Sequence, residues 1–224
     1  MVIGIKTKGL KGEPVVIKIN GLEFSVNSKT GNMIQTYILP ESWIHNKWIG
    51  SDKPVCGNCI HAQHKNADCY VRKGWSLVGL HSTIKGAIHL WKTPESFMEI
   101  IPIFSGKGFR FGTYGEAVLM GETIVKAICA VVKNWSGYTH QWRKRRYDWA
   151  AGYFMASVES VDEKLQANAL GYRTYRVMNK GESMEPDEKL CPASKEAGRT
   201  TACLFCNLCR GNSVDEKNIA IYKH

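Results

Sequence analysis

The sequence predicts an α/β protein, built as a partial barrel or an open, mostly parallel sheet, with an N-terminal β-hairpin and cysteine-rich metal-binding loops. Residues 153–178 read as strand, helix and strand, the unit that places two strands in parallel through a right-handed crossover. The stretch "GFRFGTYG" at 108–115 reads as a further strand that ends in glycines. This supply of strands is too small for a complete eight-stranded barrel.

The strand–helix–strand unit carries the clearest local signals. Ser160 can cap a helix, and Glu163 three residues later completes a capping box. Gly171 suits the position just beyond the helix C-terminus. We therefore expect strands at about 153–158 and 174–178 on either side of one helix.

Two further helices are expected before this unit. Thr93 and Pro94 are suited to the cap and first position of a short helix that ends near Ile101. The stretch after "GFRFGTYG" has one apolar helical stripe, made of Val118, Ile124, Val125, Ile128, Val131 and Val132. Cys129 lies beside this stripe and is most simply a small core residue.

The N-terminal part is expected to hold the hairpin. Asn20-Gly21 is typical of a type I′ turn, so a hairpin is predicted from about Val15 to Val26. Residues 36–59 contain prolines and glycines and are expected to be irregular. We expect one domain, with the hairpin and first cysteine loop at about 1–79, an α/β core at 80–180 and a terminal cysteine loop at 181–224.

Composition restricts the possible partners. The 224 residues are 44% hydrophobic and 22% charged, as in a soluble globular protein, and the formal charge is +10. Such an excess attracts polyanions, so nucleic acid or a nucleotide is the expected partner, with a generally basic surface as the alternative. The sequence has neither a signal-peptide core nor a long uncharged apolar run. We therefore expect a cytoplasmic protein with no membrane partner.

Seven of the eight cysteines fall into two short windows. In the second window three cysteines stand two residues apart, and a fourth, followed by a proline, lies upstream: Cys203, Cys206, Cys209 and Cys191. Iron–sulfur clusters use such combs with a remote cysteine, whereas structural zinc more often uses two separated pairs. We expect an iron–sulfur cluster here, with a 4Fe-4S cluster favoured and zinc as the alternative. In a reducing cytosol, clustered thiols favour metal over disulfides.

The first window is "CGNCIHAQHKNADC". Cys56, Cys59 and Cys69 with His61 or His64 can supply the four ligands of a zinc ion. The same three cysteines can instead hold a cluster with one iron left open, or join the second window in a shared site.

The end of the predicted strand "GFRFGTYG" offers further site residues. Tyr114, Gly115 and Glu116 stand where α/β folds build their sites, with Glu116 as a candidate base. A tight turn with a glutamate in the first helical turn explains the same residues equally well. His140 and Glu159 are placed at the same predicted edge, so the three titratable groups are candidate catalytic residues.

Residues 135–149 interleave aromatic and basic side chains. Trp142, Arg143 and Arg145 represent a pattern in which rings stack on bases and cations hold phosphates. The alternative is a solvated basic loop whose aromatic rings pack on the core.

The motifs "FRFGTYGEA", "GYTHQWR" and "CPASKEAGRTTACLFCNLC" resemble, in this order, uncharacterised cysteine-rich proteins of bacteriophages and plasmids. The resemblance spans about residues 55–211. In outline the chain is also similar to partial-barrel radical S-adenosylmethionine enzymes, although its first group reads C-x2-C-x9-C where theirs reads C-x3-C-x2-C. Use of S-adenosylmethionine therefore stays open.

Together these features predict an iron–sulfur protein of phage or plasmid type that acts on nucleic acid or nucleotides. The alternative is a zinc-stabilised, non-catalytic nucleic-acid-binding module.

Overall fold

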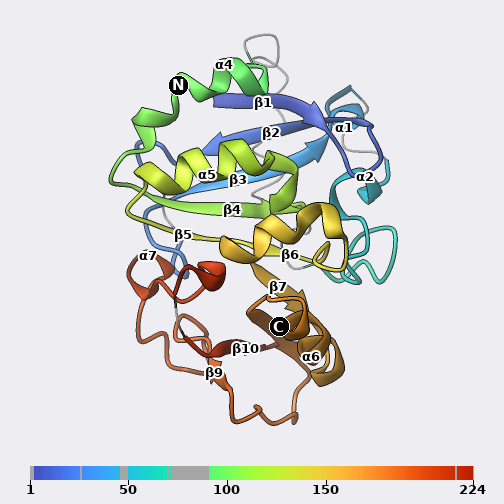
Figure 1. Ribbon diagram of the computed structural model, residues 1–224, viewed down its shortest axis with the longest axis vertical. Coiled ribbons are helices and arrows are strands. Elements are labelled where there is room, and N and C mark those ends of the chain that lie inside the picture. Colours follow the sequence, from blue (N-terminus) through green and yellow to red (C-terminus); the bar gives the residue numbers. More distant parts are fainter. Residues whose placement is uncertain are drawn as a thin grey trace.

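The computed structural model describes residues 3–25, 27–45, 50–69, 71, 91–214 and 216–223. Its strands form two five-stranded sheets, with the orders β1-β2-β3-β4-β5 and β6-β7-β8-β10-β9 (Figure 1). The strands are β1 Ile3–Lys8, β2 Pro14–Asn20, β3 Met33–Pro40, β4 Gly108–Tyr114, β5 Asn134–Ser136, β6 Tyr138–Thr139, β7 Met155–Val158, β8 Thr174–Met178, β9 Glu188–Leu190 and β10 Asn218–Tyr222.

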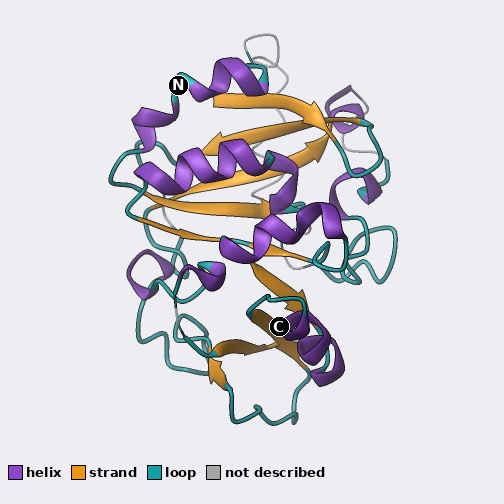
Figure 2. Ribbon diagram, viewed as in Figure 1, coloured by secondary structure: helices purple, strands orange, loops and turns teal. Residues whose placement is uncertain are grey.

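Short helices connect these strands (Figure 2). The α-helices are α1 Glu41–His45, α2 Lys53–Cys56, α4 Pro94–Met98, α5 Glu122–Val131, α6 Val161–Ala169 and α7 Cys203–Cys206. The 3-10 helices are η2 Ile101–Phe104, η3 Ala117–Met120, η4 Arg145–Gly152 and η5 Gly211–Ser213. None of the helices in the described ranges combines the length and apolar character that a membrane crossing requires.

The predicted α/β class with an open sheet is confirmed. The first sheet starts with the antiparallel strands β1, β2 and β3 and continues with β4 and β5 in parallel. The second sheet is parallel throughout. Neither sheet closes into a barrel in the part of the chain that is described. The expected boundary near residue 80, between the first cysteine loop and the α/β core, lies outside the described residues.

The N-terminal hairpin exists, but the predicted position was wrong. It is formed by β1 and β2, which pair from Ile3↔Ile19 to Lys8↔Pro14. At the predicted turn only Gly21 has a positive φ, of 81°, so Asn20-Gly21 is not a type I′ turn. The strand that pairs with β2 on its other side is β3, which begins only at Met33.

The expectation that residues 36–59 are irregular was also wrong. They include most of β3, all eight residues of which are buried between β2 and β4. A strand covered on both faces has no polar alternation, so its sequence lacks the usual strand signal. Pro40 stands at the last position, where a missing N–H costs little.

The helices follow their capping signals. Thr93 accepts a hydrogen bond from the Ser96 amide at the start of α4. Ser160 does the same for Glu163 at the start of α6, and β7 and β8 on either side of α6 pair in parallel as predicted. The long apolar stripe is split at Gly121, whose φ of 81° ends η3 before α5 begins.

The two sheets are joined through a single residue, Gly137. It separates β5, the edge of the first sheet, from β6, the edge of the second. A Cβ at this position would lie 2.5 Å from Cδ1 of Phe154 and 3.2 Å from Cβ of Phe111. The Gly137 carbonyl accepts the Met155 amide, and its own amide donates to Cys209. Glycine is therefore required where the chain passes between the sheets.

The second sheet also encloses a buried ion pair. Arg176 on β8 and Glu188 on β9 form a two-point pair, with nitrogen–oxygen distances of 2.7 and 2.6 Å. Their side chains are 1% and 0% exposed. The Arg176 guanidinium also donates to the Ser183 carbonyl, so the pair fixes the connection between the two strands.

We expect Gly137→Ala to lower the free energy of unfolding by about 1–3 kcal/mol, because the new methyl group overpacks against Phe154. Urea denaturation measures the effect. Gly152→Ala is the matched control, since a Cβ there meets nothing within 4 Å. Equal stability of the two variants would show that the passage between the sheets tolerates a side chain.

Glu188→Gln should lower the free energy of unfolding by about 3 kcal/mol, because it removes the buried counter-ion of Arg176 and leaves only the partly exposed Glu182 beside the charge. Glu122→Gln makes the same change in an exposed pair with Lys126 and should cost at most about 0.5 kcal/mol. Urea denaturation of both variants provides the comparison. A Glu188→Gln loss no larger than that of the control would contradict a structural role for the pair.

Candidate functional site

A cavity with a volume of about 580 Å³, here called the large cavity, is lined by both sheets. Its wall includes alternating residues, such as Tyr138 on β6 and His140 just beyond it, and Tyr175 and Val177 on β8. Alternate residues of a strand point to the same face. The cavity therefore lies on one face of the two sheets, next to the carboxyl ends of β4, β6 and β7.

The first cysteine group lines this cavity. Cys56 ends α2, and the Cys59 and Cys69 amides donate to the Cys56 and His61 carbonyls, so tight turns bring the three thiols to one wall. Burial raises the pKa of the Cys56 thiol well above its ordinary value, and negative charge on Asp52, Cys59, Glu116 and Cys69 adds to the rise.

The two histidines of this loop have different surroundings. Both ring nitrogens of His64 are engaged, Nδ1 at 2.6 Å from Asp52 and Nε2 at 3.1 Å from the Gly57 carbonyl. Asp52 is 1% exposed and also accepts the His64 amide, so this pair holds the loop together. His61 faces the cavity, with Nδ1 at 2.9 Å from Asp68 and Nε2 at 3.7 Å from Glu159.

The structure brings the three candidate catalytic residues together. Glu116 is 3% exposed and accepts hydrogen bonds from the Thr139 hydroxyl at 2.6 Å and from the His140 amide. The His140 ring lies between two carboxylates, with Nδ1 at 3.3 Å from Glu116 and Nε2 at 3.1 Å from Glu159. The arrangement holds an imidazole between two anions at the cavity wall.

His140 also hydrogen-bonds Cys59, which links the carboxylates to the first cysteine group. Burial lowers the pKa of His140, but the hydrogen bonds to Cys59, Glu116 and Glu159 outweigh it and hold the pKa well above its usual range. These contacts therefore favour the protonated form of the His140 ring.

The glycines before Glu116 serve the turn that positions it. Gly112 and Gly115 have φ values of 61° and 79°, and a Cβ on Gly115 would lie 2.7 Å from the Ile38 carbonyl oxygen. Tyr114 is buried between them in the chain, with its hydroxyl 3.4 Å from Asp52. Tyr114, Gly115 and Glu116 all line the cavity. The tight turn after β4 therefore also forms part of the wall of the large cavity.

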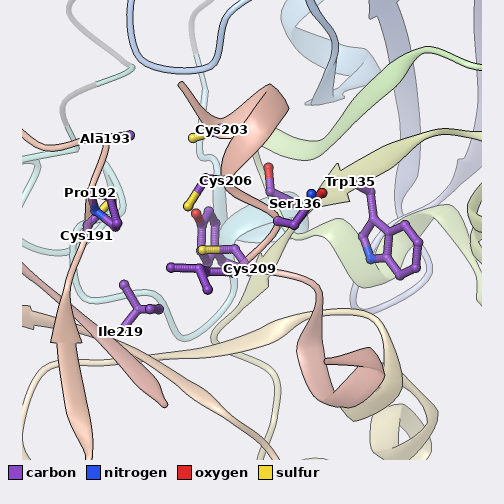
Figure 3. Close-up of a pocket in the computed structure, with 12 residues that line it drawn as sticks. Trp135, Ser136, Cys191, Pro192, Ala193, Cys203, Cys206, Cys209 and Ile219 are labelled. Atoms are coloured by element: carbon purple, nitrogen blue, oxygen red, sulfur yellow. The ribbon is translucent and has the colours of Figure 1, made fainter. Parts of the chain in front are cut away.

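The second cysteine group surrounds a separate, narrow cavity of about 10 Å³. It is lined by Cys191, Cys203, Cys206 and Cys209, and the sulfur atoms of the last three lie in a row that faces Cys191 and Pro192 (Figure 3). Burial raises the pKa of Cys209 to about 12, although the Tyr138 hydroxyl hydrogen-bonds its sulfur.

Long-range hydrogen bonds assemble this second group. The Cys191 amide donates to Ala220 on β10, and the Cys203 amide donates to the Lys29 carbonyl. Ser136 on β5 lines the same cavity, and its buried hydroxyl has no hydrogen-bond partner among the described residues. The Ser136 hydroxyl could therefore hydrogen-bond a ligand bound by the four thiols.

The two cysteine groups line different cavities that share the Tyr138 wall. All eight cysteines are free thiols. Within the described residues, no group of three or more His, Cys, Asp or Glu side chains is arranged to hold a metal ion. Cys129 is half-buried beside the core, and burial raises its pKa.

Of the residues in the basic segment 135–149, Trp142, Arg143 and Arg145 are not part of the wall of the large cavity. Trp142 is 1% exposed and donates its ring N–H to the Ser157 carbonyl. Arg143 covers the Trp142 ring at 3.7 Å and pairs with Glu163 at 2.7 Å, while Arg145 is exposed. The Trp142 ring thus packs on the core, and the arginines remain as surface cations.

The cations of the large cavity come from other places in the chain. Lys29, Arg110, Lys195, Arg199 and Lys223 line it, against the two carboxylates Asp68 and Glu116. Sequence reasoning missed them because isolated lysines and arginines carry no motif. Only Arg110 has a usable signal, since it alternates with Gly112 and Tyr114 on β4.

Comparison with known proteins finds no match to any family model, curated protein or solved structure.

Glu116→Gln should move the pKa of His140 to lower values, because it replaces a carboxylate that stabilises the imidazolium by a neutral amide. Titration of the His140 ring by NMR in metal-free protein measures the shift. Asp148→Asn, an exposed acid outside this contact, should leave the titration in place. An unchanged midpoint in Glu116→Gln would contradict the carboxylate–imidazole pairing.

Proposed function

We propose that the protein is an iron–sulfur protein of phage or plasmid type that acts on a nucleotide or nucleic acid at the large cavity. The observation that carries the proposal is the convergence of four thiols on one narrow cavity. Cys191 comes from the end of β9, and the other three come from the loop around α7, yet all four line the same space. Three cysteines two residues apart match the spacing that clusters use, although the remote Cys-Pro here precedes the comb instead of following it.

The chemistry of the surroundings fits a cluster. The buried Ser136 hydroxyl has no partner in the described chain and can donate to a sulfide, an interaction that tunes cluster potentials. Burial raises the pKa of Cys203, and positive charge on Arg110 and Lys29 offsets part of that rise. The narrow cavity is smaller than a four-iron core, so loading requires the half-exposed loop of Cys203, Cys206 and Cys209 to move outward.

A bound cluster would supply electron transfer beside the large cavity. The chain's own groups handle protons and charge there: His140 can donate a proton, and Glu116 and Glu159 hold it in position. Tyr138 separates the two cavities and touches both. A reducing, cytoplasmic compartment would keep the thiols available for the cluster.

A second candidate function is a zinc-stabilised nucleic-acid-binding module without catalysis. The narrowness of the cavity at Cys191 favours a single ion over a cluster. At the first group, Cys56, Cys59 and Cys69 lie with His140 on one wall of the large cavity, and three thiolates with one imidazole are a common zinc set. In this alternative the metals only hold loops in place.

Metal analysis separates the two functions. We expect anaerobically purified protein to be coloured and to contain about four irons and four sulfides per chain. Cys209→Ser should lose most of the iron and the visible absorption, because it removes one of the four converging ligands. Cys129→Ser is the matched control and should keep both, since Cys129 lies outside the two groups.

Near-ultraviolet circular dichroism of each variant shows whether it still folds. A colourless wild-type protein with stoichiometric zinc would reject the iron–sulfur proposal in favour of the second candidate. Equal loss of iron in Cys129→Ser and Cys209→Ser would show that the cluster does not depend on the converging thiols.

A further inference from the structure

We propose that the large cavity binds one nucleoside monophosphate unit, with its phosphate at a cationic end and its base toward the carboxylates. The ligand is either a free nucleotide or the terminal nucleotide of a single strand. This inference deepens the proposed function, on which it rests, by naming the ligand of the same cavity.

The size and walls of the cavity suit such a ligand. Its volume of about 580 Å³ falls within the range of small-molecule sites. Tyr138 and Tyr175 lie with their ring centroids 4.5 Å apart, and Val177 and Ile221 continue the same wall. Arg110 lies over the Tyr138 ring at 5.1 Å, so this apolar wall adjoins the cationic end and can cover the sugar of the ligand, while the base extends toward Glu116.

The charges in the cavity are separated along β4. Arg110 stands near the start of this strand and Glu116 just beyond its end. From Arg110 to Tyr114, four residues of strand span about 13 Å. Lys29 lies at the Arg110 end, where its ammonium is 3.5 Å from the Tyr175 hydroxyl, and both cations act on Cys203.

Two more cations stand at the mouth of the cavity, where its lining is exposed. Lys195 and Arg199 follow Cys191 in the chain, are exposed, and line the cavity. The buried Ser194 accepts the Arg199 amide with its carbonyl, which ties the two ends of this short loop together. Lys223, by contrast, is paired with Asp68 at 2.6 Å.

The opposite end offers hydrogen-bond acceptors and donors to a base. Glu116, His140 and His61 all reach this part of the wall. Here the basic groups already face carboxylates, His140 beside Glu116 and Lys223 beside Asp68, so a phosphate gains less at this end than at the exposed cations. The charge separation therefore sets the orientation of the ligand, with phosphate toward the mouth.

Calorimetric titration of anaerobically purified protein tests the proposal. The probes are AMP, GMP, CMP and UMP in turn, the matching nucleosides, inorganic phosphate, and a 5′-phosphorylated single-stranded octanucleotide. We expect at least one monophosphate, or the octanucleotide, to bind about tenfold or more tightly than the nucleoside or phosphate alone, because both parts of the unit are held.

Two double variants of equal charge locate the site. Lys195→Gln with Arg199→Gln should weaken binding about tenfold, since it removes the exposed cations of the cavity mouth. Arg143→Gln with Arg145→Gln removes two exposed cations of the basic segment and should change affinity by less than about twofold. Near-ultraviolet circular dichroism checks the folding of both variants, because Arg143 also covers the Trp142 ring and pairs with Glu163.

Each outcome decides the proposal. Binding of a monophosphate identifies a free nucleotide as a source, and binding of the octanucleotide alone identifies a strand end. The proposal is overturned if every probe binds no better than inorganic phosphate, or if affinity depends on the basic segment and not on the cavity mouth. Iron analysis of the same samples distinguishes failure of the nucleotide proposal from failure of the iron–sulfur proposal. Nucleotide binding by protein without iron would reject only the cluster.

Discussion

The passage of the chain through Gly137 is the constraint on which the rest of the structure depends. One residue without a side chain connects the edge of the first sheet to the edge of the second, with Phe154 and Phe111 packed where a Cβ would stand. Because the connection is so short, the two sheets cannot separate, and the residues on either side of it reach both cavities. Ser136 lines the narrow cavity, and Tyr138 lines both the narrow and the large one.

This geometry explains why two cysteine groups far apart in the sequence occupy neighbouring places. The first group follows α2 and reaches the carboxyl ends of the strands, whereas the second wraps around α7 beside β5 and β6. The Gly137 amide donates to the Cys209 carbonyl, so the passage itself fixes one end of the second group. Tyr138 is the boundary between them. A ligand in the large cavity would therefore contact the same side chain as a metal held by the second group.

Buried charge is concentrated where the structure can compensate for it. Glu116 is almost completely buried, but it accepts the Thr139 hydroxyl and the His140 amide and faces the His140 ring. Desolvation of a carboxylate is offset only when its oxygens are fully engaged. The same rule applies to Arg176 and Glu188 in the second sheet, where the pair joins two strands rather than forming a site. Glu116 and His140 line the large cavity, whereas Arg176 and Glu188 are buried within the second sheet.

The sequence by itself determined the α/β class, the strand–helix–strand unit with its Ser160 cap, and the two cysteine groups, because these depend on signals within a few residues. It also placed Glu116, His140 and Glu159 at one edge, since parallel strands end together. Only the tertiary structure decided that β3 is a buried strand, that Trp142 belongs to the core, and that the cavity cations come from scattered positions. Strand pairing and side-chain burial depend on partners distant in sequence, and a local pattern does not contain them.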